Sequence, residues 1–270
     1  MSGTATNRTN ITLPADMSRE ILAKMQTESA VMQLATQIEL PGKGVEIPVI
    51  TSDPTAAWVA ETGAKTVANP GLSHKLMTAY KLAVIVPFSN EFRRDAAALY
   101  DELVRRLPRA LATKFDNTVI GGTVAPGGNF DGLGSCTAQN IGSTNTYAGL
   151  VAAEADIAAH GGIMNGIILA PQGKSALLAA VDLDGRPLFI NNVSEGAVPM
   201  VLGSRTVLSK GVYVSGSPNV VGIAGDWSQA MYGTVEGVKI DYSADATLVV
   251  NASTQINLFQ QNMFAVRAEI

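Results

Sequence analysis

Cysteine is almost absent from this sequence, with Cys136 the one cysteine among 270 residues. No disulfide can form within the chain, and no pair of thiolates is available to a metal ion. Cys136 stands in a glycine- and serine-rich loop without a nearby partner, so we expect an inert thiol. Histidine is also scarce, and neither His74 nor His160 belongs to a catalytic motif. The sequence therefore predicts no catalytic residue, no metal ligand and no cofactor.

Two short segments imitate binding motifs but lack residues that those motifs require. Gly173-Lys174-Ser175 resembles the end of a phosphate-binding loop, yet Ile168 stands where the first glycine is needed. Residues 182–187 begin like a calcium loop, but no glutamate follows at the required position. We predict a polar turn there, and no Gly-x-Ser-x-Gly elbow occurs elsewhere.

Charged residues are few, at 16% of the chain, and the net charge is −4. A typical soluble domain has about a quarter. This shortage, with 26 glycines, fits either a surface covered by other copies of the chain or a large, well-buried monomer. Lysine and arginine are scattered and form no run that would neutralise phosphates, which argues against sequence-reading nucleic-acid binding. The apolar run Leu82–Val86 is far too short to span a bilayer, and no signal-peptide pattern begins the chain.

The first half contains a segment that predicts an extended hairpin. Residues 1–14 read as a flexible arm, and a helix is expected from Asp16 to about Leu34. Val45–Ile50 and Leu72–Phe88 are strand-like, and Trp58 is the one large apolar residue between them. Because an isolated hairpin is marginal in water, this one must lie on another surface. A flap over an active site is the alternative interpretation.

The strongest local pattern predicts one long helix over residues 89–119. Apolar residues recur every four positions from Leu99 to Val119, and Ser89 is a suitable N-cap. Asp101 with Arg105 and Glu102 with Arg106 have the favourable acid-before-base spacing. Such a helix would be about 45 Å long, with a bend at Pro108.

The remaining sequence mixes helices and strands without regular alternation. Residues 123–146 read as loop, 147–159 as a helix, 163–170 as a strand, and a short helix opens at Pro171. Further strands are expected at about 198–202, 205–209, 211–215, 220–224, 230–241 and 257–269. This order predicts an α+β fold.

Several ordered segments resemble the tailed-phage major capsid proteins of the HK97 fold. The resemblance covers about residues 12–270 and is carried by Ala57-Trp58-Val59-Ala60-Glu61-Thr62-Gly63, Tyr80-Lys81-Leu82-Ala83, Phe88-Ser89-Asn90-Glu91-Phe92, Asp116-Asn117-Thr118-Val119-Ile120-Gly121-Gly122, Asp184-Gly185-Arg186-Pro187-Leu188, Gly225-Asp226-Trp227-Ser228-Gln229-Ala230 and Val266-Arg267-Ala268. It implies an N-terminal arm (1–44), an extended loop (45–88), a peripheral domain with a long spine helix (89–145 and 226–270) and an axial domain (146–225). Candidate assembly contacts are Trp58, Glu61, Lys65, Arg93, Arg94, Asp101, Arg105, Asp184 and Arg186.

The resemblance implies a structural subunit and not an enzyme. Hexamers and pentamers would form an icosahedral phage head around double-stranded DNA, assembled in the bacterial host cytoplasm. Many copies of the chain are the expected partners, together with scaffolding, portal or decoration proteins, and no membrane. No scaffolding segment is visible at the N-terminus, and the Lys–Asn pair of the family's cross-link cannot be placed. Two alternatives remain: an encapsulin-like compartment shell, and a glycine-rich hydrolase with a hairpin lid.

Overall fold

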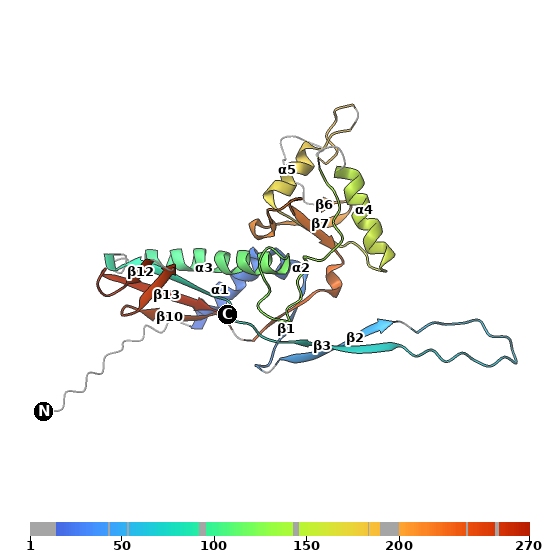
Figure 1. Cartoon of the computed structure of the whole chain (residues 1–270), viewed down its shortest axis with the longest axis horizontal. Helices are drawn as coiled ribbons and strands as arrows, with labels where there is room; N and C mark the ends of the chain where they lie inside the picture. Colours follow the sequence, from blue (N-terminus) through green and yellow to red (C-terminus); the bar gives the residue numbers. More distant parts are fainter. Residues whose placement is uncertain are drawn as a thin grey trace.

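Two structured regions and one long projection make up the chain (Figure 1). The computed structural model describes residues 15–42, 44–52, 54–91, 96–142, 146–182, 184–189, 200–235, 237–251 and 254–270. The predicted arm, residues 1–14, lies outside this part. Helices and strands follow one another in mixed order, which confirms the α+β class.

The first region packs two helices, α1 (Ala15–Glu28) and α3 (Ala96–Val119), against an antiparallel sheet. Its strands have the order β10 (Lys239–Ser243), β13 (Met263–Glu269) and β4 (Ala83–Ser89). Leu103, Leu107 and Leu111 are at most 3% exposed and share one core with Phe264 and Val266. The four-residue spacing therefore identified the buried face of α3 correctly.

The start of the long helix was predicted wrongly. Ser89 does not cap α3, because it is the last residue of β4 and pairs with Met263. The helix begins at Ala96 and has 24 residues, or about 36 Å at 1.5 Å per residue. It continues through Pro108.

The predicted helix over residues 16–34 is two helices, α1 and α2 (Ala30–Leu34). Ser29 has extended backbone angles and separates them. Its hydroxyl accepts a hydrogen bond from the Met32 amide at 3.1 Å, which caps α2. The break redirects the chain toward β1 (Thr36–Glu39), which pairs in parallel with β9 (Met231–Thr234).

The second region carries a four-stranded sheet and two helices, α4 (Thr146–Ala159) and α5 (Pro171–Ala179). The strand order is β6 (Met200–Val201), β7 (Ser204–Leu208), β5 (Gly166–Leu169) and β8 (Gly222–Gly225). β5 is buried throughout, and its Ile167 and Leu169 share a core with Leu177 of α5. The strand predicted at 211–215 is wrong: a 3-10 turn, η2 (Lys210–Val212), stands at its start.

The projection is an antiparallel hairpin of β2 (Val45–Ser52) and β3 (Gly71–Met77). Its loop, residues 54–70, has no helix or strand and extends away from both regions (Figure 1). The predicted second arm, 72–88, is split: β3 pairs with β2, whereas β4 pairs with β13. Near the C-terminus, β11 (Thr247–Asn251) and β12 (Thr254–Asn257) form a second, smaller hairpin.

Candidate assembly surfaces

The projecting hairpin exposes apolar side chains that a water-facing ribbon does not need. Trp58 is fully exposed, at 105% of its reference area, and Val67 is 87% exposed. Ile50 and Leu72, which pair across the two strands, are also exposed. A two-stranded ribbon with both faces in water is marginal in stability, and contiguous exposed apolar surface marks an interaction site.

Of the predicted contact residues in the projecting loop, Glu61 lies within a tight turn and Lys65 follows it. The Gly63 amide donates to the Ala60 carbonyl at 2.9 Å, which closes the turn around Glu61. Glu61 and Lys65 are exposed, and neither forms an ion pair with another described residue. Both charges are thus available to a partner.

The base of the hairpin is held by the loop that follows α3. Lys75 of β3 forms an ion pair with Asp131. The Asn129 amide donates to the Tyr80 hydroxyl at 3.2 Å, and the Tyr80 and Phe130 rings meet edge to face. The base of the hairpin is therefore held by the body, while its far loop extends away from both structured regions (Figure 1).

One of the two ion pairs predicted on the long helix is present, and Arg105 shares its carboxylate. Arg105 donates to Glu102 at 2.5 Å, and Arg106 pairs with the same carboxylate. These contacts, the Arg105 hydrogen bond first, hold the pKa of Glu102 below its usual value. The Glu102–Arg106 pairing is confirmed. The side chain of Asp101, and residues Arg93 and Arg94, lie outside the described part.

The turn predicted at residues 182–187 is present and presents two charges. The Asp182 carboxylate accepts from the amides of Asp184 and Arg186 at 2.9 and 2.7 Å, and a bridge joins Val181 to Pro187. The Asp184 and Arg186 side chains are exposed. Within the described ranges, no cluster of three or more His, Cys, Asp or Glu side chains could hold a metal ion.

Asp116 is a buried carboxylate that sequence reasoning did not single out as a site residue. Its oxygens accept from the hydroxyls of Ser29 at 2.6 Å and Ser209 at 2.7 Å, and from the amides of Ala30 at 3.0 Å and Val31 at 3.3 Å. Burial raises the pKa of Asp116, and the four donors oppose that rise.

The Asp116 cluster joins both structured regions. Ser29 precedes α2, Asp116 lies on α3, and Ser209 connects β7 to η2. One feature of the sequence could have identified Asp116: it stands four residues after Ala112 and four before Ile120, so a carboxylate interrupts a row of apolar residues. Both apolar neighbours are buried in the structure.

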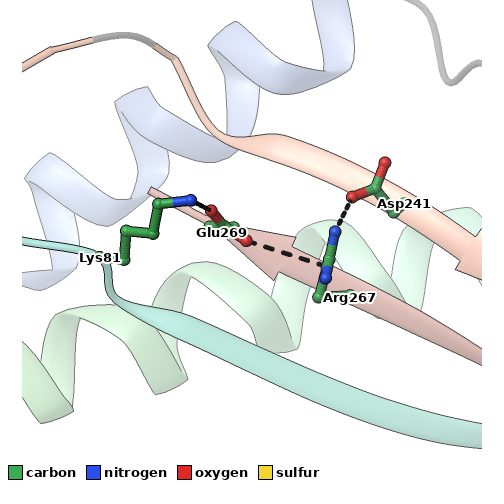
Figure 2. Close-up of polar contacts among 4 residues, drawn as sticks. All are labelled: Lys81, Asp241, Arg267 and Glu269. Carbon is green, nitrogen blue, oxygen red and sulfur yellow. Dashed lines mark hydrogen bonds and ion pairs between the residues drawn. The ribbon is translucent and has the colours of Figure 1, made fainter. Parts of the chain in front are cut away.

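A chain of ion pairs fastens the last strand, as Figure 2 shows. Lys81 donates to Glu269 at 2.7 Å, Arg267 lies 3.9 Å from Glu269, and Arg267 pairs with Asp241. The Lys81 contact holds the pKa of Glu269 below its usual value. Leu82 and Ile270 exchange two backbone hydrogen bonds of 2.8 and 2.9 Å, which extend the pairing of β4 with β13 by one residue on each strand.

The Cys136 thiol and the described helices show no sign of a reactive site or of a membrane span. Partial burial and the Asp156 carboxylate raise the pKa of Cys136, as expected of a poorly reactive thiol. In the ranges that the structure covers, no helix combines the length and apolar character needed to cross a bilayer.

A two-region body with an exposed apolar projection fits the class of structural subunits that cover their surfaces with other subunits. The chain belongs to the phage capsid family, which matches residues 9–270. It is thus a structural component of the virion and not an enzyme: a major capsid protein of a tailed-phage head, with the HK97-like architecture.

Individual relatives agree with this family. The chain is 30% identical to the probable major capsid protein gp17 of Mycobacterium phage L5, over 95% of this chain and 83% of that one. It is 26% identical to the major capsid protein of Staphylococcus phage 80alpha, over 95% and 79%.

Solved structures share the fold. A chain of Mycobacterium phage Adephagia superposes with a TM-score of 0.69 at 21% identity, covering 89% of this chain and 81% of that one. The capsid of an empty GTA particle gives a TM-score of 0.55 at 14% identity, covering 99% and 90%. The family favours a phage capsid over the compartment shell and the hydrolase.

Proposed function

We propose that this chain forms hexamers and pentamers of an icosahedral head that encloses double-stranded DNA without reading its sequence. The fully exposed Trp58, at the far part of a projection with no internal support, carries the proposal. The projecting hairpin lies across a neighbouring subunit, where Trp58, Glu61 and Lys65 make contacts. Assembly takes place in the bacterial host cytoplasm, with scaffolding, portal or decoration proteins as further partners.

The proposed peripheral and axial domains correspond to the two structured regions. The peripheral domain, 89–145 and 226–270, contains α3 and most of the β10-β13-β4 sheet. The axial domain, 146–225, contains the four-stranded sheet, and its turn carrying Asp184 and Arg186 faces other axial domains. Residues 1–44 form the N-terminal arm. Of the extended loop, 45–88, the projecting hairpin makes up residues 45–77. We assign β4 to the peripheral domain, because it pairs with β13.

The energetics favour assembly through many modest contacts. A tryptophan buries about 150–250 Å², so seating Trp58 on a neighbour contributes about 4–6 kcal/mol at about 25 cal/mol per Å². Much of this is offset by the cost of association. Closed symmetry repeats the contact in every subunit, so a shell is stable although one contact is weak.

Deleting the loop tests the proposal. Replacing residues 54–70 with a short Asn-Gly turn should leave the free energy of unfolding nearly unchanged, because the described loop buries little of its own chain. Closed particles in electron micrographs should disappear. Val124→Ala is the matched control, since Val124 is 95% exposed and lies outside the projecting hairpin. Closed particles of the loop variant at the control's yield would refute the proposed contact.

A further inference from the structure

Five cations line one open groove of about 930 Å³. Arg105, Arg106, Arg109 and Lys114 come from α3, and Lys210 comes from η2. All five side chains are exposed. Among the described residues that line the groove, none is acidic. Four of these cations lie within residues 105–114, and folding brings Lys210 of η2 beside them.

Close packing of η2 on α3 fixes the far end of the groove. A Cβ at Gly211 would lie 2.5 Å from the Thr113 carbonyl oxygen, so only glycine allows this approach. The Asn117 side-chain amide donates to the Gly211 carbonyl at 3.1 Å, and the Ser209 hydroxyl accepts from the Gly211 backbone amide at 3.2 Å. Lys210 is thereby placed in the same groove as Lys114.

Most of the positive charge in the groove is uncompensated within the described chain. Glu102 supplies one carboxylate to both Arg105 and Arg106. Arg109, Lys114 and Lys210 form no ion pair with any described residue. The chain as a whole has a net charge of −4, so the groove is a local exception that attracts anions.

The lining chemistry suits phosphates better than an apolar peptide. Arginine offers a planar fork of donors that matches phosphate oxygens, and Thr113 and Asn117 also line the groove. The apolar lining residues offer no large exposed anchor to a partner: Leu107 is 1% exposed, Val86 is half-buried and Ala110 is small. A protein segment would need such an anchor, since buried apolar side chains dominate protein interfaces.

The length of the groove also matches a nucleic-acid backbone. Residues 105 to 114 span about 14 Å along a helix, and duplex DNA carries one charge per about 1.7 Å of its axis. Several phosphates can therefore lie beside the cations at once. We propose that this basic groove binds the phosphate backbone of the double-stranded DNA that the shell encloses. This inference rests on the proposed function, and phosphate contacts of this kind carry no sequence information.

The test measures binding of a fluorescent 20-base-pair duplex to the purified full-length chain by anisotropy, across a salt series. The variant is Lys114→Ala with Lys210→Ala, and the matched control is Lys174→Ala with Lys239→Ala, which removes the same charge elsewhere. The groove variant should bind about tenfold more weakly, and its slope of log affinity against log salt should fall by about 1.8, for two lost contacts. The control should match the wild type.

Equal affinity and equal salt slope in the groove and control variants would overturn the inference. A polyglutamate peptide serves as a second probe: loss of peptide binding with unchanged duplex binding would assign the groove to an acidic protein segment and also overturn it. Electron micrographs of both variants keep the two proposals apart, because closed shells with unchanged duplex binding would refute the groove and leave the capsid assignment intact.

Discussion

Replacing Asp116 with asparagine puts a hydrogen-bond donor where the fold requires an acceptor. Both carboxyl oxygens accept, one from Ser29 and Val31 and the other from Ser209 and Ala30. If the carboxyl is protonated, its O–H can donate to a serine hydroxyl while both oxygens still accept from the backbone amides of Ala30 and Val31. The amide nitrogen of asparagine cannot accept, so one backbone amide loses its partner whichever way the side chain is turned.

The cost follows from the chemistry of that amide. A serine hydroxyl can rotate to accept instead of donating, but a backbone N–H cannot. A buried donor left without a partner costs about 1–3 kcal/mol, so Asp116→Asn should lower the free energy of unfolding by about 2 kcal/mol. Asp116→Ala strands several donors and should cost more than about 3 kcal/mol. Both changes weaken the junction of α2, α3 and η2.

Urea denaturation of the unassembled chain at pH 7.5, followed by circular dichroism, measures these differences. Asp131→Asn is the matched control, because Asp131 pairs with Lys75 at an exposed site and such pairs contribute about 0–1 kcal/mol. If Asp116→Asn and Asp131→Asn destabilise the chain equally, the Asp116 cluster does not hold the two regions together.

Two further substitutions test the ion pair between Lys81 and Glu269 and the packing of η2 on α3. Lys81 lowers the pKa of Glu269 from its usual 4.5, so this contact contributes stability above that value and loses it as pH falls further. Glu269→Gln should therefore flatten the fall in melting temperature below pH 4.5; a wild-type profile would contradict this. Gly211→Ala places a Cβ 2.5 Å from the Thr113 oxygen and should destabilise the chain by about 1–3 kcal/mol; a change below about 0.5 kcal/mol in urea denaturation would refute the close packing of η2.

Periodic patterns in the sequence were sufficient for the elements that bury one face. The four-residue spacing of leucines predicted the buried side of α3, and the weakly apolar stretch between β2 and β3 predicted an extended hairpin that needs outside support. Both depend on side-chain positions a few residues apart, which a sequence displays directly.

Features that depend on distant partners were missed. β4 was assigned to the hairpin, and the long helix was begun at Ser89, because nothing local reveals that Ser89 pairs with Met263. The break at Ser29 depends on a cap assembled with Asp116, which lies 87 residues away. The basic groove likewise needs η2 beside α3 before Lys210 joins the four cations of that helix.

A cryo-electron microscopy map of assembled particles, in which the side chain at position 58 is located, tests the self-assembly account most directly. We expect Trp58 to be covered by a neighbouring subunit in every hexamer, with most of its surface removed from water. A map of closed shells in which Trp58 remains as exposed as it is in the single chain would contradict the account.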